Sequence, residues 1–383
     1  MTNPFQYGNV VSEEAFCNRR KELTEIVRVM ENGGRAFIYS ERRMGKTSLV
    51  KLALSKLPRK EYITVYCDLW PTDGEESFVT TLAKALTESM KTTVQKALES
   101  ARTLFSHLSP SLTLDDEGKP SVTFTATARN KIIQQLDEVL AAATRIGAAG
   151  KKKVVIVFDE IQQILEYEND HVERRLRSII QHQKNVAYIF LGSRKHIVQK
   201  MFLDKSRPLY RAAAHIPLSA IPEKEWELFI RQRFLSAKKQ IADGQIQSLC
   251  ELTQGHPFYT QHLSHVVWEL CEPSKSVSEG LIRDAVDTLL SRENHAYTVL
   301  WESLTRNQQR LLKVLATDKK SIQLFASDFI RRAQLGSASN VQRVVDSLLS
   351  KDVIDRENGS YIILDRFLRL WIHKVQVVGA PSF

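Results

Sequence analysis

Residues 35–49 read RAFIYSERRMGKTSL, and this stretch decides the fold. The apolar run 36–39 predicts a buried strand, and the following Gly45-Lys46-Thr47 predicts a tight loop that opens a helix. Backbone N–H groups of such a loop surround a phosphate, and the lysine reaches the β- and γ-phosphates. The Thr47 hydroxyl is suited to bind Mg²⁺. The stretch therefore predicts a site for a nucleoside triphosphate.

Ser40 departs from the usual pattern G-x-x-x-x-G-K-[ST], which has a glycine at this position. Serine fits there if its φ is negative, so we expect phosphate binding to be kept and turnover to be the more sensitive property. Lys46 is also expected to act in catalysis. The residues expected to surround the nucleotide in this loop are Ser40, Arg42, Arg43, Met44, Gly45, Lys46, Thr47 and Ser48.

A second motif, FDEIQ, begins at Phe158, the last residue of the apolar run 154–158. Its strand delivers Asp159 and Glu160 to the carboxyl end of a parallel sheet, where ligands of such sheets bind. We expect Asp159 to hold Mg²⁺ with Thr47, and Glu160 to orient and deprotonate the attacking water. The alternative is that both carboxylates only cap the next helix. The adjacent Asp-Glu pair indicates the P-loop branch with strand order 5-1-4-3-2.

Two arginines are candidates for contact with the γ-phosphate. Arg194 follows the apolar run 187–191, where its guanidinium could sense that phosphate, although a surface arginine is the alternative. Arg211 lies ahead of a fifth apolar run and could act in its own site or in that of a neighbouring copy. Residues 194–211 hold six basic residues and one acidic residue, so a merely basic surface explains Arg211 equally well.

The composition is that of an ordinary folded protein, with 383 residues, 43% of them hydrophobic. The apolar runs are of strand length, and the start shows no secretory pattern, so neither a membrane span nor secretion is expected. Four scattered cysteines favour reduced thiols and a cytoplasmic location over zinc. The net charge of +10 suggests an acidic partner such as nucleic acid, because nucleotide alone does not require it.

The pattern along the chain predicts three domains. Strand-like runs alternate with helical patterns over residues 1–220, which predicts an α/β fold with a parallel sheet. Alternation near 109–130 predicts a β-hairpin inserted into this core, either an effector contact or decoration. Residues 221–298 show helical patterns only, which predicts a helical lid. Residues 299–383 show three helical patterns and then two short β runs around Asn358-Gly359, which predicts a winged helix.

At Gly255 and Pro257 a helix of the lid opens with the sequence Gly-His-Pro. The proline ring offers a flat apolar contact for an adenine base. The alternative is the ordinary sequence of a glycine that ends one helix and a proline that begins the next.

These motifs, in this order, resemble the STAND-type P-loop ATPases, in particular the group called archaeal-type ATPases. The resemblance covers nearly the whole chain, from NPF-x-Y-G at 3–8 and F-x-N-R-x-x-E-L at 16–23 to the terminal winged helix. It implies that the N-terminal block lies near adenine, that Arg194 is the sensor, and that the Gly-x-Pro module closes over the nucleotide. The adenine-site residues it implies are Tyr7, Phe16, Arg19, Gly255 and Pro257.

The resemblance implies an ATPase that acts as a slow, Mg²⁺-dependent switch able to form oligomers, with the winged helix as its output. Duplex DNA and a protein are both open as partners, since residues 301–383 hold 13 basic and 8 acidic residues, a mild bias. The alternative is an origin-recognition-like ATPase stimulated by duplex DNA. A third reading, a nucleotide-holding scaffold without catalysis, gives Glu160 no chemical use.

Overall fold

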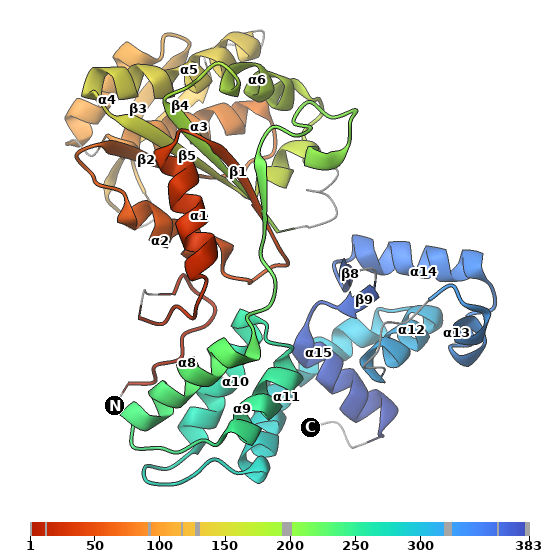
Figure 1. The fold of residues 1–383 in the computed structure, drawn as a ribbon. Coiled ribbons are helices and arrows are strands. Elements are labelled where there is room, and N and C mark those ends of the chain that lie inside the picture. The colour runs from red at the N-terminus through yellow and green to blue at the C-terminus, as the bar shows by residue number, and fades with distance from the viewer. Residues whose placement is uncertain are drawn as a thin grey trace. The chain divides into compact units, whose positions relative to one another are not determined.

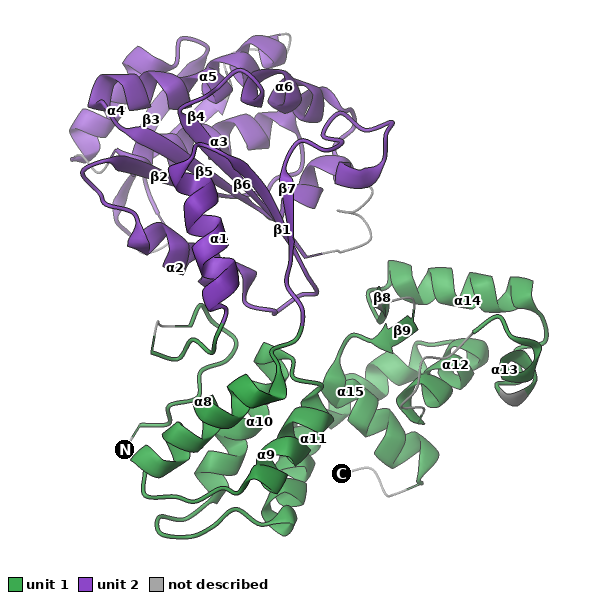
Figure 2. Ribbon diagram, viewed as in Figure 1, with its two compact units in different colours: residues 1–18, 220–383 green, residues 19–219 purple. Residues whose placement is uncertain are grey.

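The chain forms two compact units (Figure 2). Residues 19–219 make the core unit, and residues 1–18 and 220–383 together make the helical unit. The computed structural model describes residues 2–11, 14–90, 93–115, 118–126, 131–193, 201–317, 324–357 and 360–379. The first 18 residues therefore group with the C-terminal part of the chain, and the three-domain division stays a prediction.

The core unit is built on one five-stranded parallel sheet in the order β2-β5-β6-β1-β7 (Figure 2). In chain order, these are the five strands expected from the apolar runs, and the predicted order 5-1-4-3-2 is confirmed. The strands are β1 (Arg35–Tyr39), β2 (Tyr62–Asp68), β5 (Lys153–Asp159), β6 (Val186–Gly192) and β7 (Ala214–Pro217).

Helices cover both faces of this sheet, because its central strands are apolar on both sides. All seven residues of β6 are buried, as is β5 after its first residue. Figure 1 shows α1 and α2 on one face and α3, α5 and α6 on the other. The helices of the core unit are α1 (Arg20–Glu31), α2 (Lys46–Lys56), α3 (Glu75–Ser89), α4 (Val94–Leu104), α5 (Ile132–Gly150) and α6 (His171–Ile180), with a 3₁₀ helix at Ile161–Glu166.

The hairpin expected near 109–130 is present as β3 (Leu108–Leu114) and β4 (Pro120–Ala126), which pair antiparallel. Phe124 is buried against the edge of the Phe105 ring, at 5.4 Å between ring centroids. Leu114 is 70% exposed near the tip. Residues 116–117 and 127–130 lie outside the described residues.

The helical unit begins with a four-helix module made of α8 (Glu223–Ser236), α9 (Asp243–Thr253), α10 (Pro257–Leu270) and α11 (Glu279–Glu302). The N-terminal segment completes its core, because Phe5 is 2% exposed and packs against the rings of Phe229 and Phe234. The boundary predicted at 298/299 falls inside α11, which continues to Glu302.

The C-terminal part is a winged helix, as predicted. Its elements are α12 (Arg306–Thr317), α13 (Ser327–Arg332), α14 (Ala338–Ser350), the hairpin strands β8 (Ile354–Glu357) and β9 (Ser360–Ile363), α15 (Arg366–Trp371) and a π-helical turn at Ile372–Val377. The Trp371 ring packs against Tyr297 and Trp301, so α15 is joined to α11. Among the described residues, no helix combines the length and apolar character that crossing a bilayer requires.

Candidate functional site

The loop between β1 and α2 has the backbone that a phosphate-binding loop needs. Arg43 and Gly45 have φ values of 61° and 83°, and Gly45 is the N-cap of α2. Ser40 is not among the residues with positive φ, so a side chain at this position costs no backbone strain. The condition that the sequence placed on Ser40 is therefore met, and the loop needs no glycine there.

Lys46 is held inside this loop. Its Nζ donates to the carbonyl of Glu41 at 2.8 Å, to Oγ of Ser40 at 3.1 Å and to the Ser40 carbonyl at 3.4 Å. The side chain is 5% exposed. Burial lowers the pKa of Lys46 to about 8, against the opposing pull of the carboxylates of Glu160, Asp159 and Glu41. A bound anion such as a phosphate would favour the charged ammonium and raise the pKa of Lys46 again.

Asp159 brings the two motifs of the sequence together. Its Oδ2 accepts a hydrogen bond from the Thr47 hydroxyl at 2.9 Å and another from the Tyr66 hydroxyl. Its Oδ1 accepts from the backbone N–H of Glu160 at 2.9 Å. These bonds fix the carboxylate at the carboxyl end of β5, beside the first turn of α2.

Tyr66 is a residue of this site that the sequence analysis missed. Burial, followed by the Asp159 carboxylate, raises the pKa of its phenol, so the hydroxyl stays protonated and donates. The predicted strand order already places 62–67 beside 154–158. The Tyr66 hydroxyl, near the end of the strand 62–67, can therefore reach Asp159, which follows the strand 154–158.

The oxygen donors of Thr47 and Asp159 fit a magnesium ion. Mg²⁺ takes oxygen ligands, keeps several waters and is usually bound by one or two protein groups plus phosphate oxygens. A hydroxyl and a carboxylate 2.9 Å apart supply two such donors on one side. The hydrogen bond from the Tyr66 hydroxyl orients the Asp159 carboxylate, as groups next to a metal ligand commonly do.

Glu160 stands at the turn between β5 and the 3₁₀ helix, with a left-handed backbone (φ 52°). Its Oε2 accepts from the Ser193 hydroxyl at 2.6 Å and from the side-chain amide of Gln162. Ser193 and Gln162 are both buried. These hydrogen bonds tie the carboxylate to the end of β6, where the sequence placed the sensor. Arg194, the next residue, lies outside the described residues.

The other arginines predicted to contact the nucleotide, Arg42, Arg43 and Arg211, are exposed at the surface of the core unit. Arg42 and Arg43 are exposed in the loop, and the Arg42 guanidinium lies 5.8 Å from the ring centroid of Trp70, which is 56% exposed. Arg211 is exposed on a turn, and its guanidinium lies 5.3 Å from the centroid of the Tyr210 ring. Met44 and Ser48 are buried and support the loop. The roles expected for these residues stay predictions.

Three of the residues expected near adenine lie together in the helical unit. Tyr7 stacks on the ring of His262 at 3.8 Å between centroids, on the helix that begins with Pro257. Gly255 has a φ of 64°, and a Cβ there would meet the Ile221 carbonyl oxygen at 2.7 Å. The backbone therefore requires glycine at position 255, and Pro257 is the first residue of α10. Both residues fit the fold whether or not they contact adenine.

The remaining two belong to different units. Phe16 is half-buried in the helical unit. Arg19 belongs to the core unit, is 6% exposed, and donates to the Glu22 carboxylate at 3.0 Å and the Ser219 carbonyl at 2.5 Å. This structural role accounts for its burial. The expected contact of all five residues with adenine remains a prediction.

Comparison with known proteins supports the same reading of the core. A family described as an ATPase domain predominantly from Archaea matches residues 16–263. The chain belongs to this ATPase family. A second family, described as a probable winged helix domain, matches residues 295–374 of this archaeal-type ATPase. Among curated proteins none matches the chain.

Solved structures with a similar fold cover almost the whole chain. The Walker-type ATPase PABY2304 of Pyrococcus abyssi has a TM-score of 0.63 at 17% identity, covering 97% of this chain and 99% of its own. The ORC2 protein of Aeropyrum pernix, in ADPNP–ADP complexes, has a TM-score of 0.55 at 14% identity, covering 98% of both chains. At such identities the likeness shows a shared fold.

Proposed function

We propose that this ATPase-family protein is an Mg²⁺-dependent molecular switch of the STAND class, which hydrolyses ATP slowly and reports its nucleotide state through the winged helix. The observation that carries the proposal is the meeting of Thr47, Asp159 and Tyr66 around one carboxylate oxygen, next to a buried Lys46. Mg²⁺, when bound by Thr47 and Asp159, supplies charge that neutralises the phosphates.

The chain's own residues supply the rest of the chemistry. The Lys46 ammonium exchanges the carbonyls of Ser40 and Glu41 for phosphate oxygens and holds the β- and γ-phosphates. The hydrogen bonds to Glu160 converge on its Oε2, so its Oε1 is the atom that orients a water and accepts its proton as the water attacks the γ-phosphorus. The bond between that phosphorus and the bridging oxygen breaks, and ADP leaves with the electron pair.

The helical unit offers a physical route from nucleotide to output. The helix α10, which the sequence assigns to the adenine contact, touches the winged helix directly. The rings of Tyr259 and His262 lie 5.0 and 5.4 Å from the ring centroid of Phe367 in α15. His262 also stacks on Tyr7. A displacement of α10 on nucleotide exchange would thus be passed to α15 by packed aromatic rings.

If the winged helix bound DNA, the helix before its hairpin, α14, would be the one to enter the major groove, and its charge favours a switch over a DNA-stimulated ATPase. Its charged residues are Arg343 and Asp346, both exposed, so the helix is neutral overall. Phosphate contacts of a DNA reader demand a clear positive footprint. A neutral helix is better suited to contact a protein.

The test is phosphate release by the full chain and three variants, with and without duplex DNA. Glu160→Gln should bind ATP and turn it over about 100-fold more slowly, as expected for loss of a positioned base. Lys46→Ala should lose nucleotide binding, whereas Lys56→Ala, which changes an exposed lysine at the other end of α2, should behave as the parent. Full turnover by Glu160→Gln would show that the catalytic assignment is wrong.

The switch itself is tested by hydrogen exchange in Glu160→Gln, which should keep ATP bound. Exchange in α10 and α15 should differ between the ATP- and ADP-bound forms, because the ring contacts link the two helices. Identical exchange in both forms would refute the route. DNA stimulation that disappears in Lys46→Ala would instead favour the origin-recognition-like function.

A further inference from the structure

A cavity of about 820 Å³ opens in the core unit beside the first half of β2. We call it the edge groove. Its floor and walls come from β2, α2, α3, α4 and the end of α5. They include the apolar side chains of Leu54, Leu57, Ile63, Leu104 and Ile146. The groove lies at the amino end of the sheet, whereas Asp159 and Glu160 follow the carboxyl end of β5, so it is separate from the nucleotide site.

The backbone of β2 is available along this groove. Within the described residues, β2 is the terminal strand of its sheet and pairs with β5 alone. The Glu61 carbonyl accepts from Lys153, and the Leu69 N–H donates to Asp159. Alternate residues of a parallel strand bond to the same neighbour, so Thr64 points its N–H and C=O away from β5. Thr64 also lines the edge groove. An open edge of this kind is a template for another strand.

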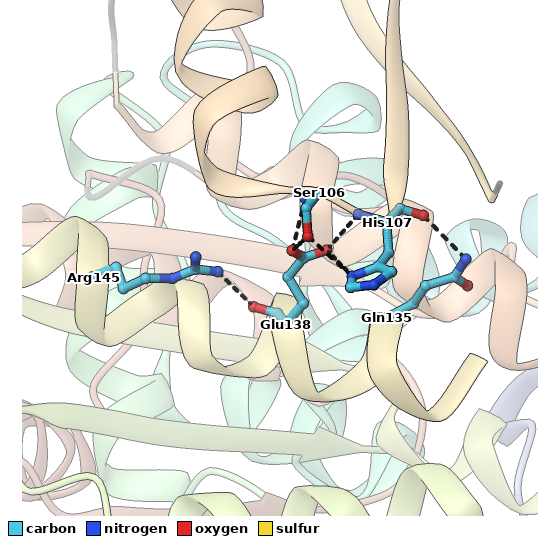
Figure 3. Close-up of polar contacts among 5 residues, drawn as sticks. All are labelled: Ser106, His107, Gln135, Glu138 and Arg145. Carbon is cyan, nitrogen blue, oxygen red and sulfur yellow. Dashed lines mark hydrogen bonds and ion pairs between the residues drawn. The ribbon is translucent and has the colours of Figure 1, made fainter. Parts of the chain in front are cut away.

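Hydrogen bonds join the chain just after α4 to α5, as Figure 3 shows. The Glu138 carboxylate on α5 accepts from the N–H and hydroxyl of Ser106, both at 2.7 Å, and from the N–H of His107 at 3.0 Å. The Gln135 amide donates to the His107 carbonyl at 3.1 Å. Burial opposes ionisation of Glu138, but these hydrogen bonds prevail and lower its pKa. The chain just after α4 is thereby joined to α5, and both helices contribute side chains to the groove.

The rim of the groove is basic. Lys51, Arg59, Arg145 and Lys152 line it, with Glu99 as the carboxylate among the lining residues. In the described part of the chain, no ion pair neutralises any of the four cations. The Arg145 guanidinium donates to the Glu138 carbonyl at 3.1 Å, and the Lys152 ammonium to the Arg59 carbonyl at 2.9 Å. These bonds to neutral oxygens hold Arg145 and Lys152 without compensating their charge, and the Lys51 ammonium lies 5.1 Å from the centroid of the Tyr66 ring.

We propose that the edge groove binds an extended segment of a partner protein, rich in apolar and acidic residues, as an added strand beside β2. The backbone of Thr64 supplies the pairing. Apolar and cationic side chains line the groove on both faces of the sheet, with Leu54 and Lys51 on α2 and Ile146 and Arg145 on α5, so the segment meets both kinds of side chain on each of its faces. A nucleic acid would satisfy the cations but would leave the apolar floor and the strand edge without partners. The groove thus gives the core unit a docking surface independent of the winged helix.

The probe is a phage-displayed library of random 12-residue peptides, selected against the full chain. Selected peptides should be enriched in both apolar and acidic residues. Their affinity, measured by fluorescence anisotropy, should fall at least tenfold in Thr64→Pro, which removes the outward N–H from a strand edge that tolerates proline. Thr64→Val, which keeps the N–H, should bind as the parent does.

Charge reversal provides a second, independent variant in case Thr64→Pro does not fold. The pair Arg59→Glu and Lys152→Glu should also lower the affinity at least tenfold. The matched pair Lys96→Glu and Arg102→Glu, exposed on α4 but not lining the groove, should leave it unchanged. ADP affinity and melting temperature establish that each variant is folded.

Three results would overturn the proposal. The first is a selected set without acidic enrichment. The second is binding that survives in a folded Thr64→Pro or in the charge-reversed pair. The third is displacement of the peptide by a single-stranded 20-nucleotide DNA that itself binds with equal affinity, which would make the groove a nucleic-acid site.

Discussion

The low pKa of Lys46 predicts how nucleotide affinity depends on pH. Without nucleotide the ammonium loses its proton near pH 8, because it is buried and its partners are mainly carbonyls. Bound phosphate favours the charged form and raises this pKa, so binding above pH 8 must take up a proton. At pH 9 about one molecule in eleven is still protonated, compared with about nine in ten at pH 7. The dissociation constant for ADP should therefore rise about tenfold between pH 7 and 9, or by about 1.4 kcal/mol.

The assay is isothermal titration of ADP in two buffers with different ionisation enthalpies, which also counts protons. Uptake should be about 0.1 proton per ADP at pH 7 and about 0.9 at pH 9. Lys46→Arg is the control, because a guanidinium stays charged over this range. An affinity that changes less than about twofold in the parent, or an equal fall in Lys46→Arg, would refute the reasoning.

Three further outcomes are expected. Tyr66→Phe removes a hydrogen-bond donor to Asp159 and should raise the Mg²⁺ concentration for half-maximal turnover several-fold, with ADP affinity little changed. If that Mg²⁺ concentration did not change, Tyr66 would have no role in positioning Asp159. Arg207→Leu removes the cation that pairs with the buried Glu173 carboxylate and should lower the free energy of unfolding of the core unit in urea by about 3 kcal/mol. The double variant Arg207→Leu/Glu173→Leu should recover most of this stability, and a double variant as unstable as the single one would contradict the pairing. Gly255→Ala should lower the melting temperature of the helical unit by several degrees; a neutral result would mean that the Ile221 carbonyl moves away.

The sheet was predictable because short stretches of sequence indicate both its buried strands and their order. Runs such as 154–158 and 187–191 are apolar throughout, as strands buried on two faces must be, and the Asp159-Glu160 pair selected the strand order. The grouping of the first 18 residues with the helical unit was not predictable. It depends on Phe5 packing against rings more than 200 positions away, which no local pattern encodes.

The candidate site was predictable where a motif names the residue type, as at Lys46, Thr47 and Asp159. It was not where function rests on a contact between elements. The serine that holds Glu160 follows β6, and serine belongs to no motif there. Tyr66 is a partial exception, because the predicted strand order places its strand beside the one that ends at Asp159. For Gly255 the backbone conformation explains the residue without any ligand, so a motif match there says less than it does at the phosphate loop.

The contact of Phe5 with Phe229 also constrains how the protein is made. A ribosome adds about 5 to 20 residues per second, so this N-terminal ring waits roughly 10 to 45 s for its partner to be synthesised. All of residues 19–219 emerge in that interval and are able to fold first. A nascent chain must therefore keep the segment around Phe5 unpaired and free of misfolding while residues 19–219 fold, before the rings that it packs against have been made.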